Sequence, residues 1–261
     1  MAWKARVSIG GDVIYVTMLG YNSAEMVEGA MKNFDETVEM RQDIVKSLFL
    51  LGYPLPSKEE NKKLLLALAD KYGWVTHEIP NVSVMENWNV AIHEVHKLRE
   101  GDYLCCFDAD VRMQQRGWLP AMVEVLEANP RAVFVCAARP FHDEAWCVNQ
   151  HGRQIHVLPS GTRFATYREL IAWSTGLWKG DWLSLRPRDF AAAHPVYGWT
   201  EMADLERMAK YGKGWVSMVD HLDDHQSDKC DPLYTEWKRA CAENRTQDKF
   251  DDWLTHLPQD K

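Results

Sequence analysis

Apolar strand-like runs alternate with amphipathic helical segments along the first half of the chain, and this alternation restricts the fold more than any other feature. Between the first two runs, Asn22-x-x-Glu25 is a helix-capping sequence that precedes a stripe of apolar residues at helical spacing. Such alternation predicts an α/β fold, with a mostly parallel sheet, right-handed crossovers and helices on both faces. The runs lie at 13–19, 47–52, 74–79 and 102–107.

The second half of the chain is less regular. Glycines and prolines between 139 and 167 indicate loops and short strands, and a last apolar run at 215–219 predicts one more strand. We find no linker, repeat or low-complexity block that would separate two folding units. We therefore expect a single domain with two halves, 1–138 and 139–261.

Two carboxylates follow the fourth apolar run directly. The strand Leu104–Phe107 stops on Asp108-Ala109-Asp110, a polar loop at 111–116 follows, and a helix is expected from about 117 to 128. Aspartates are also common in turns, so a purely conformational role is one interpretation. However, two acids at the end of a buried strand repel each other and lose hydration unless a cation compensates them. Mg²⁺ or Mn²⁺ suits such a pair, because each takes its remaining ligands from water and substrate phosphates.

Composition excludes some classes of function. The 261 residues are 46% hydrophobic, which allows a large core, and the net charge of −8 argues against wrapping around a polyanion. A local basic groove around Lys179, Arg186 and Arg188 is still able to contact phosphates. The six cysteines form no CxxC pair, and neither an apolar leader nor a long membrane-spanning run is present. We expect reduced thiols and a cytoplasmic location.

The motifs together resemble the GT-A fold nucleotide-sugar glycosyltransferases, especially the large family of inverting enzymes. Asp108-Ala109-Asp110 is similar to their DxD motif, Trp118-Leu119 to the segment after it, and Asn87-Trp88-Asn89 to their Asn-rich helix start. The resemblance covers about 13–227. It implies that 1–138 binds the nucleotide sugar, and that 139–261 forms the acceptor side and completes the metal site.

The resemblance also implies a set of site residues. Asp110 would bind Mn²⁺ or Mg²⁺ and Asp108 would lie nearer the ribose or the metal, with His225, or else His221, as a further metal ligand. A separate zinc site from His221, His225 and Cys230 matches no strong spacing template. Residues assigned to the donor are Thr17, Gly20, Tyr21, Asn22, Gly52, Asp108 and Gly176, the last in a turn that feeds a strand under the sugar.

Two acids near residue 200 are the candidate catalytic residues. Thr200 is expected to cap a helix on which Glu201 and Asp204 share one face, and the helix N-terminus favours ionised carboxylates. The inverting family commonly places its base where this chain has Met202. Either Glu201 or Asp204 has taken over proton transfer, with Glu201 ranked first, or the reaction is of the retaining type.

These observations predict a metal-dependent transfer of a sugar from a nucleoside diphosphate, with UDP favoured, to a hydroxyl acceptor. Soluble glycans, proteins, metabolites and modified DNA bases all remain candidate acceptors. One alternative is a phosphatase of the haloacid-dehalogenase type, because Phe107–Val111 also resembles its nucleophile strand, although that strand is normally the first in the chain. The other alternative is a sugar-nucleotide-binding module without chemistry.

Overall fold

The computed structural model describes residues 13–20, 23–39, 44–51, 58–79, 84–138, 154–166, 175–187, 204 and 207–226. Within these ranges the chain alternates strands and helices through its first half and is richer in strands afterwards. In chain order the elements are β1 (Ile14–Gly20), α1 (Ala24–Thr37), β2 (Ile44–Leu51), α2 (Lys58–Tyr72), β3 (Val75–Ile79), α3 (Val84–Val90), the π-helical η1 (Ala91–His96), β4 (Tyr103–Phe107), β5 (Val111–Met113), α4 (Trp118–Ala128), β6 (Ala132–Ala138), β7 (Ile155–Val157), β8 (Arg163–Thr166), β9 (Thr175–Lys179), α6 (Gly180–Ser184) and β10 (Gly214–His225).

One sheet runs through the described part of the molecule in the order β3-β2-β1-β4-β9-β6-β10-β8-β7, and β5 pairs with β10 off this path. The strands β3, β2, β1 and β4 pair in parallel, and β6 pairs in parallel with β10. β9 is antiparallel to both of its neighbours, β4 and β6, and β8 is antiparallel to β10. The expected mostly parallel α/β sheet is confirmed, and strands from both halves of the chain share it.

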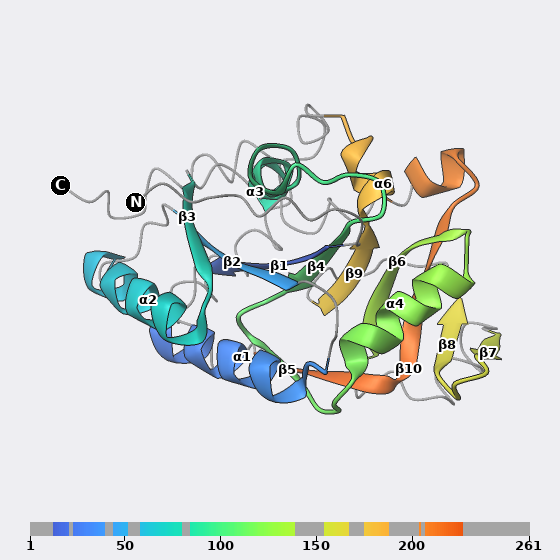
Figure 1. The fold of residues 1–261 in the computed structure, drawn as a ribbon, viewed down its shortest axis with the longest axis horizontal. Helices are drawn as coiled ribbons and strands as arrows, with labels where there is room; N and C mark the ends of the chain where they lie inside the picture. The colour runs from blue at the N-terminus through green and yellow to red at the C-terminus, as the bar shows by residue number, and fades with distance from the viewer. Residues whose placement is uncertain are drawn as a thin grey trace, which may run out of the picture.

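Helices cover both faces of this sheet, as the edge-on view in Figure 1 shows. On one face α1, α2 and α4 enclose a core that includes Phe34, Phe107 and Trp118. On the other face α3, η1 and α6 enclose a second core that includes Trp88 and Trp178. All five residues of β4 are buried, as expected for a central strand covered on both sides.

Most helices and strands lie where the sequence predicts them, but three local features differ from the prediction. The first helix begins at Ala24 with Ser23 as its cap, one residue later than expected, because the Ser23 hydroxyl accepts from the Met26 amide at 3.3 Å. The expected polar loop at 111–116 begins with the strand β5. The last strand continues past residue 219 to His225.

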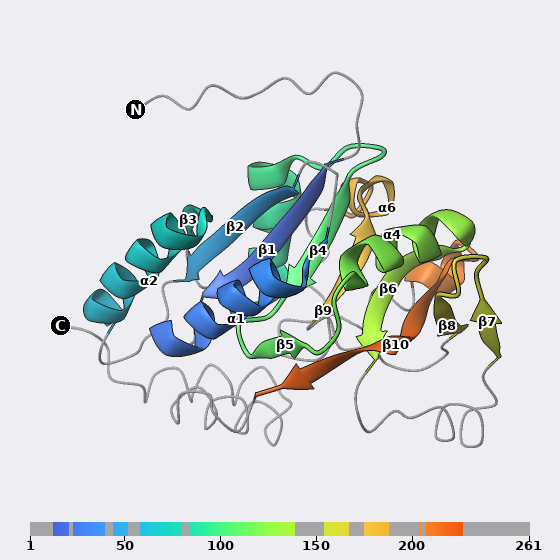
Figure 2. The ribbon, with the colours of Figure 1, turned by 60° about the horizontal axis from the view of Figure 1, so that its bottom comes forward.

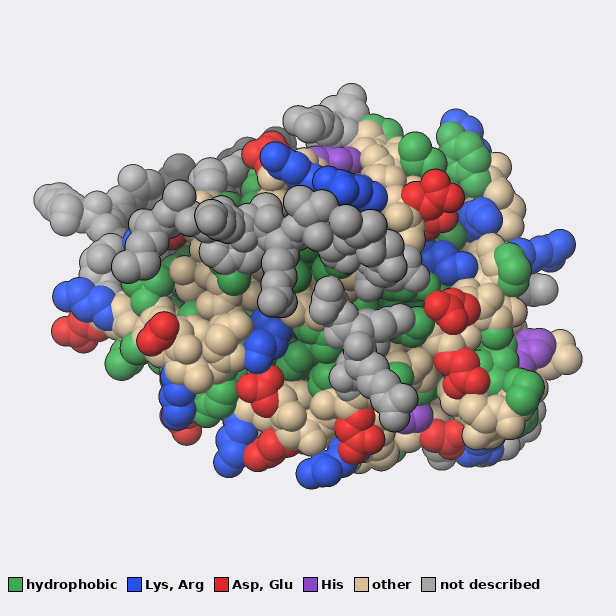
Figure 3. Space-filling view, viewed as in Figure 1, with side chains coloured by type: hydrophobic (Ala, Val, Ile, Leu, Met, Phe, Trp, Pro, Cys, Tyr) green, Lys and Arg blue, Asp and Glu red, His purple; other side chains and the backbone are tan. Residues whose placement is uncertain are grey.

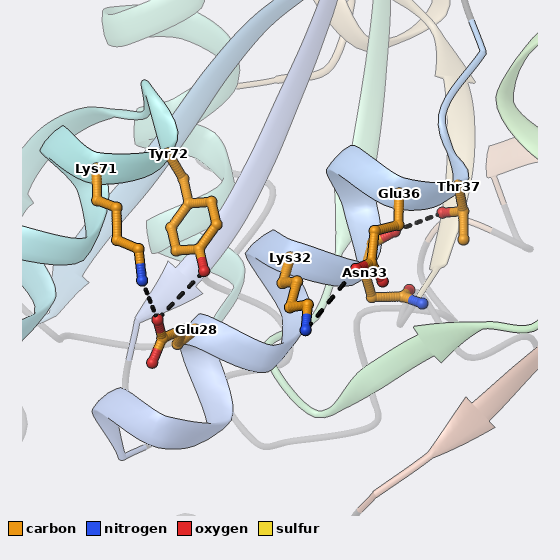
Figure 4. Close-up of polar contacts among 7 residues, drawn as sticks. All are labelled: Glu28, Lys32, Asn33, Glu36, Thr37, Lys71 and Tyr72. Atoms are coloured by element: carbon orange, nitrogen blue, oxygen red, sulfur yellow. Dashed lines mark hydrogen bonds and ion pairs between the residues drawn. The ribbon is translucent and has the colours of Figure 1, made fainter.

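Polar contacts on the outer surface join α1 to α2. The Glu28 carboxylate accepts from Lys71 Nζ at 2.6 Å and from the Tyr72 hydroxyl at 3.2 Å (Figure 4). Acidic and basic side chains are interspersed over the face seen in Figure 3. Among the described helices, none is both long enough and apolar enough to cross a membrane.

Candidate functional site

The acid pair lies where the sequence predicted it, immediately after β4. The turn Asp108–Asp110, called the acid turn below, is closed by a hydrogen bond from the Val111 amide to the Asp108 carbonyl at 3.2 Å. Asp108 is partly buried, whereas Asp110 is only 3% exposed. The two carboxylates therefore sit at the carboxyl edge of the parallel strands, where ligands of open α/β sheets bind.

Aromatic packing fixes the two chain segments that flank the acid turn. The Phe107 ring at the end of β4 stacks on the Trp118 ring at the start of α4, with centroids 5.7 Å apart. Trp118 Nε1 also donates to the Thr37 hydroxyl at 3.0 Å. The turn is thus held between two buried anchors, which limits its freedom to move.

Strand β10 returns to the acid turn from the far end of the described chain. After a register shift between Ser217 and Leu222 it pairs with β6 once more, at Ala138, and then runs antiparallel to β5, which sets His225 opposite Val111. The Gln226 amide then donates to the Asp110 carbonyl at 2.6 Å. Figure 2 shows this β5–β10 ladder crossing the edge at which β1 and β4 end.

The ladder brings the backbone of His225 beside the acid turn. The His225 imidazole lies outside the described part of the structure, so its role as a metal ligand stays a prediction. His221, the second choice, lies four residues earlier on β10, and burial lowers its pKa. Cys230, the third member of the alternative zinc site, lies outside the described residues.

Asp204 is buried against an arginine. Its Oδ2 atom accepts from Arg186 Nη2 at 2.7 Å, and the two side chains are 2% and 0% exposed. Burial raises the Asp204 pKa to about 6, while the nearby Arg186 and Arg207 guanidinium groups partly offset this effect. The expectation that Arg186 belongs to an open basic groove is wrong, because its guanidinium is enclosed with this carboxylate.

The acid turn and the Arg186–Asp204 pair both lie within electrostatic reach of one residue of β4. Burial raises the pKa of the Cys106 thiol, and Asp108, Arg186 and Asp204 all act on it electrostatically. Asp108 and Asp204 are 96 positions apart in sequence, yet both lie close to the end of this strand. The other candidate catalytic acid, Glu201, lies outside the described residues.

Three residues assigned to the donor are packed within the protein. Thr17 is fully buried, with its hydroxyl 2.7 Å from His96 Nε2. A side chain at Gly20 would press on β2, 3.0 Å from Leu48 Cδ1. Gly176 lies inside β9 and not in a turn. A Cβ atom there would overlap the Phe134 ring, so glycine is needed for close packing. The donor residues Tyr21, Asn22 and Gly52 lie outside the described residues.

Two residues next to the acid turn were not singled out in the sequence. Arg112, on β5, donates to the Ala109 carbonyl at 3.0 Å and the Val111 carbonyl at 2.6 Å. Asn33, on α1, exchanges two hydrogen bonds with the Met113 backbone. The apolar–polar–apolar sequence at 111–113 is the local signal for β5, but no local signal marks its partners on α1 and β10.

The donor chemistry of the acid turn suits a hard divalent cation. Carboxylate oxygens are preferred ligands of Mg²⁺ and are accepted by Mn²⁺, and a substrate-binding site keeps some positions open for water and phosphate. Within the described residues, no three His, Cys, Asp or Glu side chains converge to form a complete protein cage. The donor chemistry of Asp108 and Asp110, two carboxylates in one turn, fits a cation of this kind.

Comparison with known proteins identifies the fold. No protein-family profile matches the sequence, and no curated protein sequence matches it. Among solved structures, the mannosyltransferase PcManGT from Pyrobaculum calidifontis, crystallised with GDP-Man and Mn²⁺, superposes with a TM-score of 0.58 at 14% identity, covering 87% of this chain and 60% of that one. GalNAc-T7 with UDP, GalNAc and Mn²⁺ also gives 0.58, at 10% identity over 84% of this chain and 44% of that chain.

A third similar structure is closer in length. Glucosyl-3-phosphoglycerate synthase from Mycobacterium tuberculosis, in complex with Mg²⁺ and UDP, gives a TM-score of 0.50 at 13% identity, covering 90% of this chain and 79% of that one. At such identities the similarity concerns the fold alone. The chain has the GT-A-type fold of nucleotide-sugar glycosyltransferases, as the sequence resemblance implied, and it spans about half the length of the first two structures.

Proposed function

We propose that this protein is a glycosyltransferase that moves a sugar from a nucleoside diphosphate to a hydroxyl acceptor, with Mn²⁺ or Mg²⁺ held by the acid turn. The observation that carries the proposal is the position of Asp108 and Asp110. They follow the central strand of a GT-A-type sheet, and the end of β10 is hydrogen-bonded to Asp110. Similar folds bind GDP-Man with Mn²⁺ or UDP with a divalent cation, which supports the same class of donor here.

The acid turn supplies the part of the site that acts on the leaving group. Asp110 would hold the cation and Asp108 would lie nearer the ribose, with the His225 imidazole as a further ligand. When bound, the cation would neutralise the negative charge that develops on the departing nucleoside diphosphate. The rigid backbone around the turn keeps both carboxylates in place before the donor arrives, which reduces the reorganisation needed for binding.

The acceptor side would be supplied by the acids near residue 200. Glu201 is our first candidate for the base that takes the acceptor proton, and Asp204 is the second. The ion pair with Arg186 favours the ionised form of Asp204, even though burial raises its pKa to about 6.

Donor hydrolysis is the direct test of the proposed function. Purified protein is incubated with UDP-glucose, UDP-galactose, UDP-N-acetylglucosamine, UDP-N-acetylgalactosamine and GDP-mannose, with either Mn²⁺ or EDTA. We expect slow release of one nucleoside diphosphate with Mn²⁺ and none with EDTA, and a UDP-sugar is the favoured donor. NMR of the released sugar then distinguishes inverting from retaining chemistry.

The same assay tests the alternatives. A haloacid-dehalogenase-type phosphatase would instead release phosphate from simple esters, but the GT-A-type fold removes the structural basis for that alternative. A binding module would be stabilised by a nucleotide sugar without cleaving it, and this result would contradict the proposed chemistry. The similar structures that we describe are crystallised with nucleotides and sugars and give no support to DNA as the acceptor.

A further inference from the structure

Arg112 connects the acid turn to helix α1 through backbone hydrogen bonds. Its Nη1 atom donates to the carbonyls of Ala109 and Val111, and its Nη2 atom donates to the Met26 carbonyl at 2.8 Å. Ala109 is the central residue of the acid turn, and Met26 lies in the first turn of α1. One planar guanidinium group therefore ties together two segments that are more than 80 positions apart in sequence.

Helix α1 is shaped to receive this side chain. Met26, Gly29 and Asn33 lie three and four residues apart, so they share one face of the helix. At Gly29 a Cβ atom would be 2.3 Å from Arg112 Nη2 and 3.0 Å from its Cζ atom. The absence of a side chain at Gly29 thus provides the space in which the guanidinium group lies.

The same face of α1 also holds the strand that follows the acid turn. Asn33 Nδ2 donates to the Met113 carbonyl at 3.0 Å, and the Met113 amide donates to Asn33 Oδ1 at 2.7 Å. Asn33 projects from α1 toward β5 (Figure 4). The opposite edge of β5 is bonded to β10, so Arg112 and Asn33 fix the side that β10 does not reach.

We propose that Arg112 is a positioning residue, which fixes the acid turn against α1 so that Asp108 and Asp110 are set for a divalent cation before it binds. This inference rests on the proposed function, because it assigns the metal to the acid turn. Three hydrogen bonds of the guanidinium go to backbone carbonyls, and a longer one, at 3.7 Å, goes from Nη2 to Met26 Sδ. Such contacts fix the course of the chain and do not compete with the cation for the carboxylates.

The charge of Arg112 and its position have opposite effects on the binding of a cation at the acid turn. Asp110 and Asp224 lie within electrostatic reach of Arg112, so its charge alone would oppose a second cation nearby. A substitution that only removes the charge would then strengthen metal binding. A substitution that keeps the charge but displaces the guanidinium tests the positioning role without this complication.

The experiment compares Arg112→Lys, Gly29→Ala and Arg112→Met with the wild type. Arg112→Lys keeps the charge and loses the planar fork, and Gly29→Ala keeps Arg112 itself but displaces the end of its flexible side chain. Lys32→Ala is the matched control, because Lys32 is an exposed residue of the same helix. Mn²⁺ is titrated alone and with UDP while thermal stabilisation is followed, and amide hydrogen exchange is measured on the metal-free protein.

We expect Arg112→Lys and Gly29→Ala to raise the Mn²⁺ concentration for half-maximal stabilisation about tenfold, which is the lower end for residues that orient metal ligands. Amide exchange at Val111 should become faster in both variants before metal is added. Lys32→Ala should stay within about twofold of the wild type in the titration. Gly29→Ala should still fold, because the higher helix propensity of alanine offsets part of the loss of the Arg112 hydrogen bonds.

Two results would overturn the inference and leave the proposed function standing. One is wild-type Mn²⁺ binding in both Arg112→Lys and Gly29→Ala. The other is tighter binding in Arg112→Met with no change in Arg112→Lys, which would mean that Arg112 acts through charge alone. If the wild type itself does not respond to Mn²⁺ with UDP, both the inference and the proposed function fall.

Discussion

The acid turn and the buried Asp204 present carboxylates close to the end of β4, yet the protein stabilises them in different ways. The acid turn is held through its backbone, by Val111, Gln226 and Arg112, and its carboxylates lie at the edge where ligands enter. Asp204 is held through its side chain, by a salt bridge to the enclosed Arg186. The comparison teaches that the acid turn is fixed by hydrogen bonds of its backbone and Asp204 by an ion pair of its side chain, and our proposal assigns the external cation to the former.

The largest effect is expected from Asp110→Asn. This change removes a carboxylate that would hold the cation, so donor hydrolysis with Mn²⁺ should fall by at least about 100-fold. The melting temperature without metal is measured in parallel, because Asp110 is buried and also interacts electrostatically with Arg112. Asp70→Asn, at an exposed position of α2, is the matched control and should change neither quantity. Full activity of Asp110→Asn would contradict the assignment of the cation to the acid turn and not to the region of Asp204.

A second prediction concerns the enclosed ion pair. Arg186→Met leaves Asp204 buried without its cation, and this should lower the free energy of unfolding by about 3 kcal/mol. The double variant Arg186→Met/Asp204→Leu should recover most of that loss, because no uncompensated charge remains. Urea denaturation measures the free energy of unfolding of the single and the double variant. The control is Lys62→Met in the exposed Lys62–Glu78 pair, for which we expect a change below about 1 kcal/mol. An equal loss in the control would show that burial of the Arg186–Asp204 pair has no special effect.

A third prediction concerns the loss of stability at low pH, which we assign to His96 and not to the acid turn or the Arg186–Asp204 pair. Burial lowers the pKa of His96 to about 3, and the nearby His77 adds to this shift. In the unfolded chain the histidine pKa is about 6.5, so the imidazole binds a proton at a pH at which the folded protein keeps it neutral. The folded protein therefore loses stability as the pH falls from about 6.5 toward 3. From pH 7.5 to pH 5 this residue should remove about 2 kcal/mol.

The measurement is urea denaturation at both pH values for the wild type and His96→Gln, which keeps a polar group near Thr17. The variant should show the smaller loss of stability on acidification. His156→Gln, at a partly exposed position of β7, should behave as the wild type does. An unchanged loss in His96→Gln would assign the acid sensitivity to other groups.

The sequence allowed the regular half of the fold to be predicted, because its signals are local. The strands β1 to β4 lie where the sequence predicts strands, helices lie between them, and each strand pairs in the parallel half of the sheet. The acid turn was found for the same reason, since two aspartates at the end of a fully buried strand are visible without knowledge of the fold.

The surroundings of the acid turn could not be predicted, because they depend on distant partners. β5 is only three residues long, and it is stabilised by pairing with β10 more than 100 positions later. Arg112 is an ordinary polar residue in the sequence, and only the fold brings it to Gly29 and Met26. Likewise the sequence placed Arg186 in a local basic groove, and only the fold encloses it with Asp204.

The most direct test of the account is anomalous diffraction from a crystal soaked with Mn²⁺ and UDP. Our account predicts one strong manganese peak in contact with Asp110 and the diphosphate, with Asp108 on the same side of the site. A diphosphate bound away from the acid turn, or a manganese peak that touches neither aspartate, would contradict it.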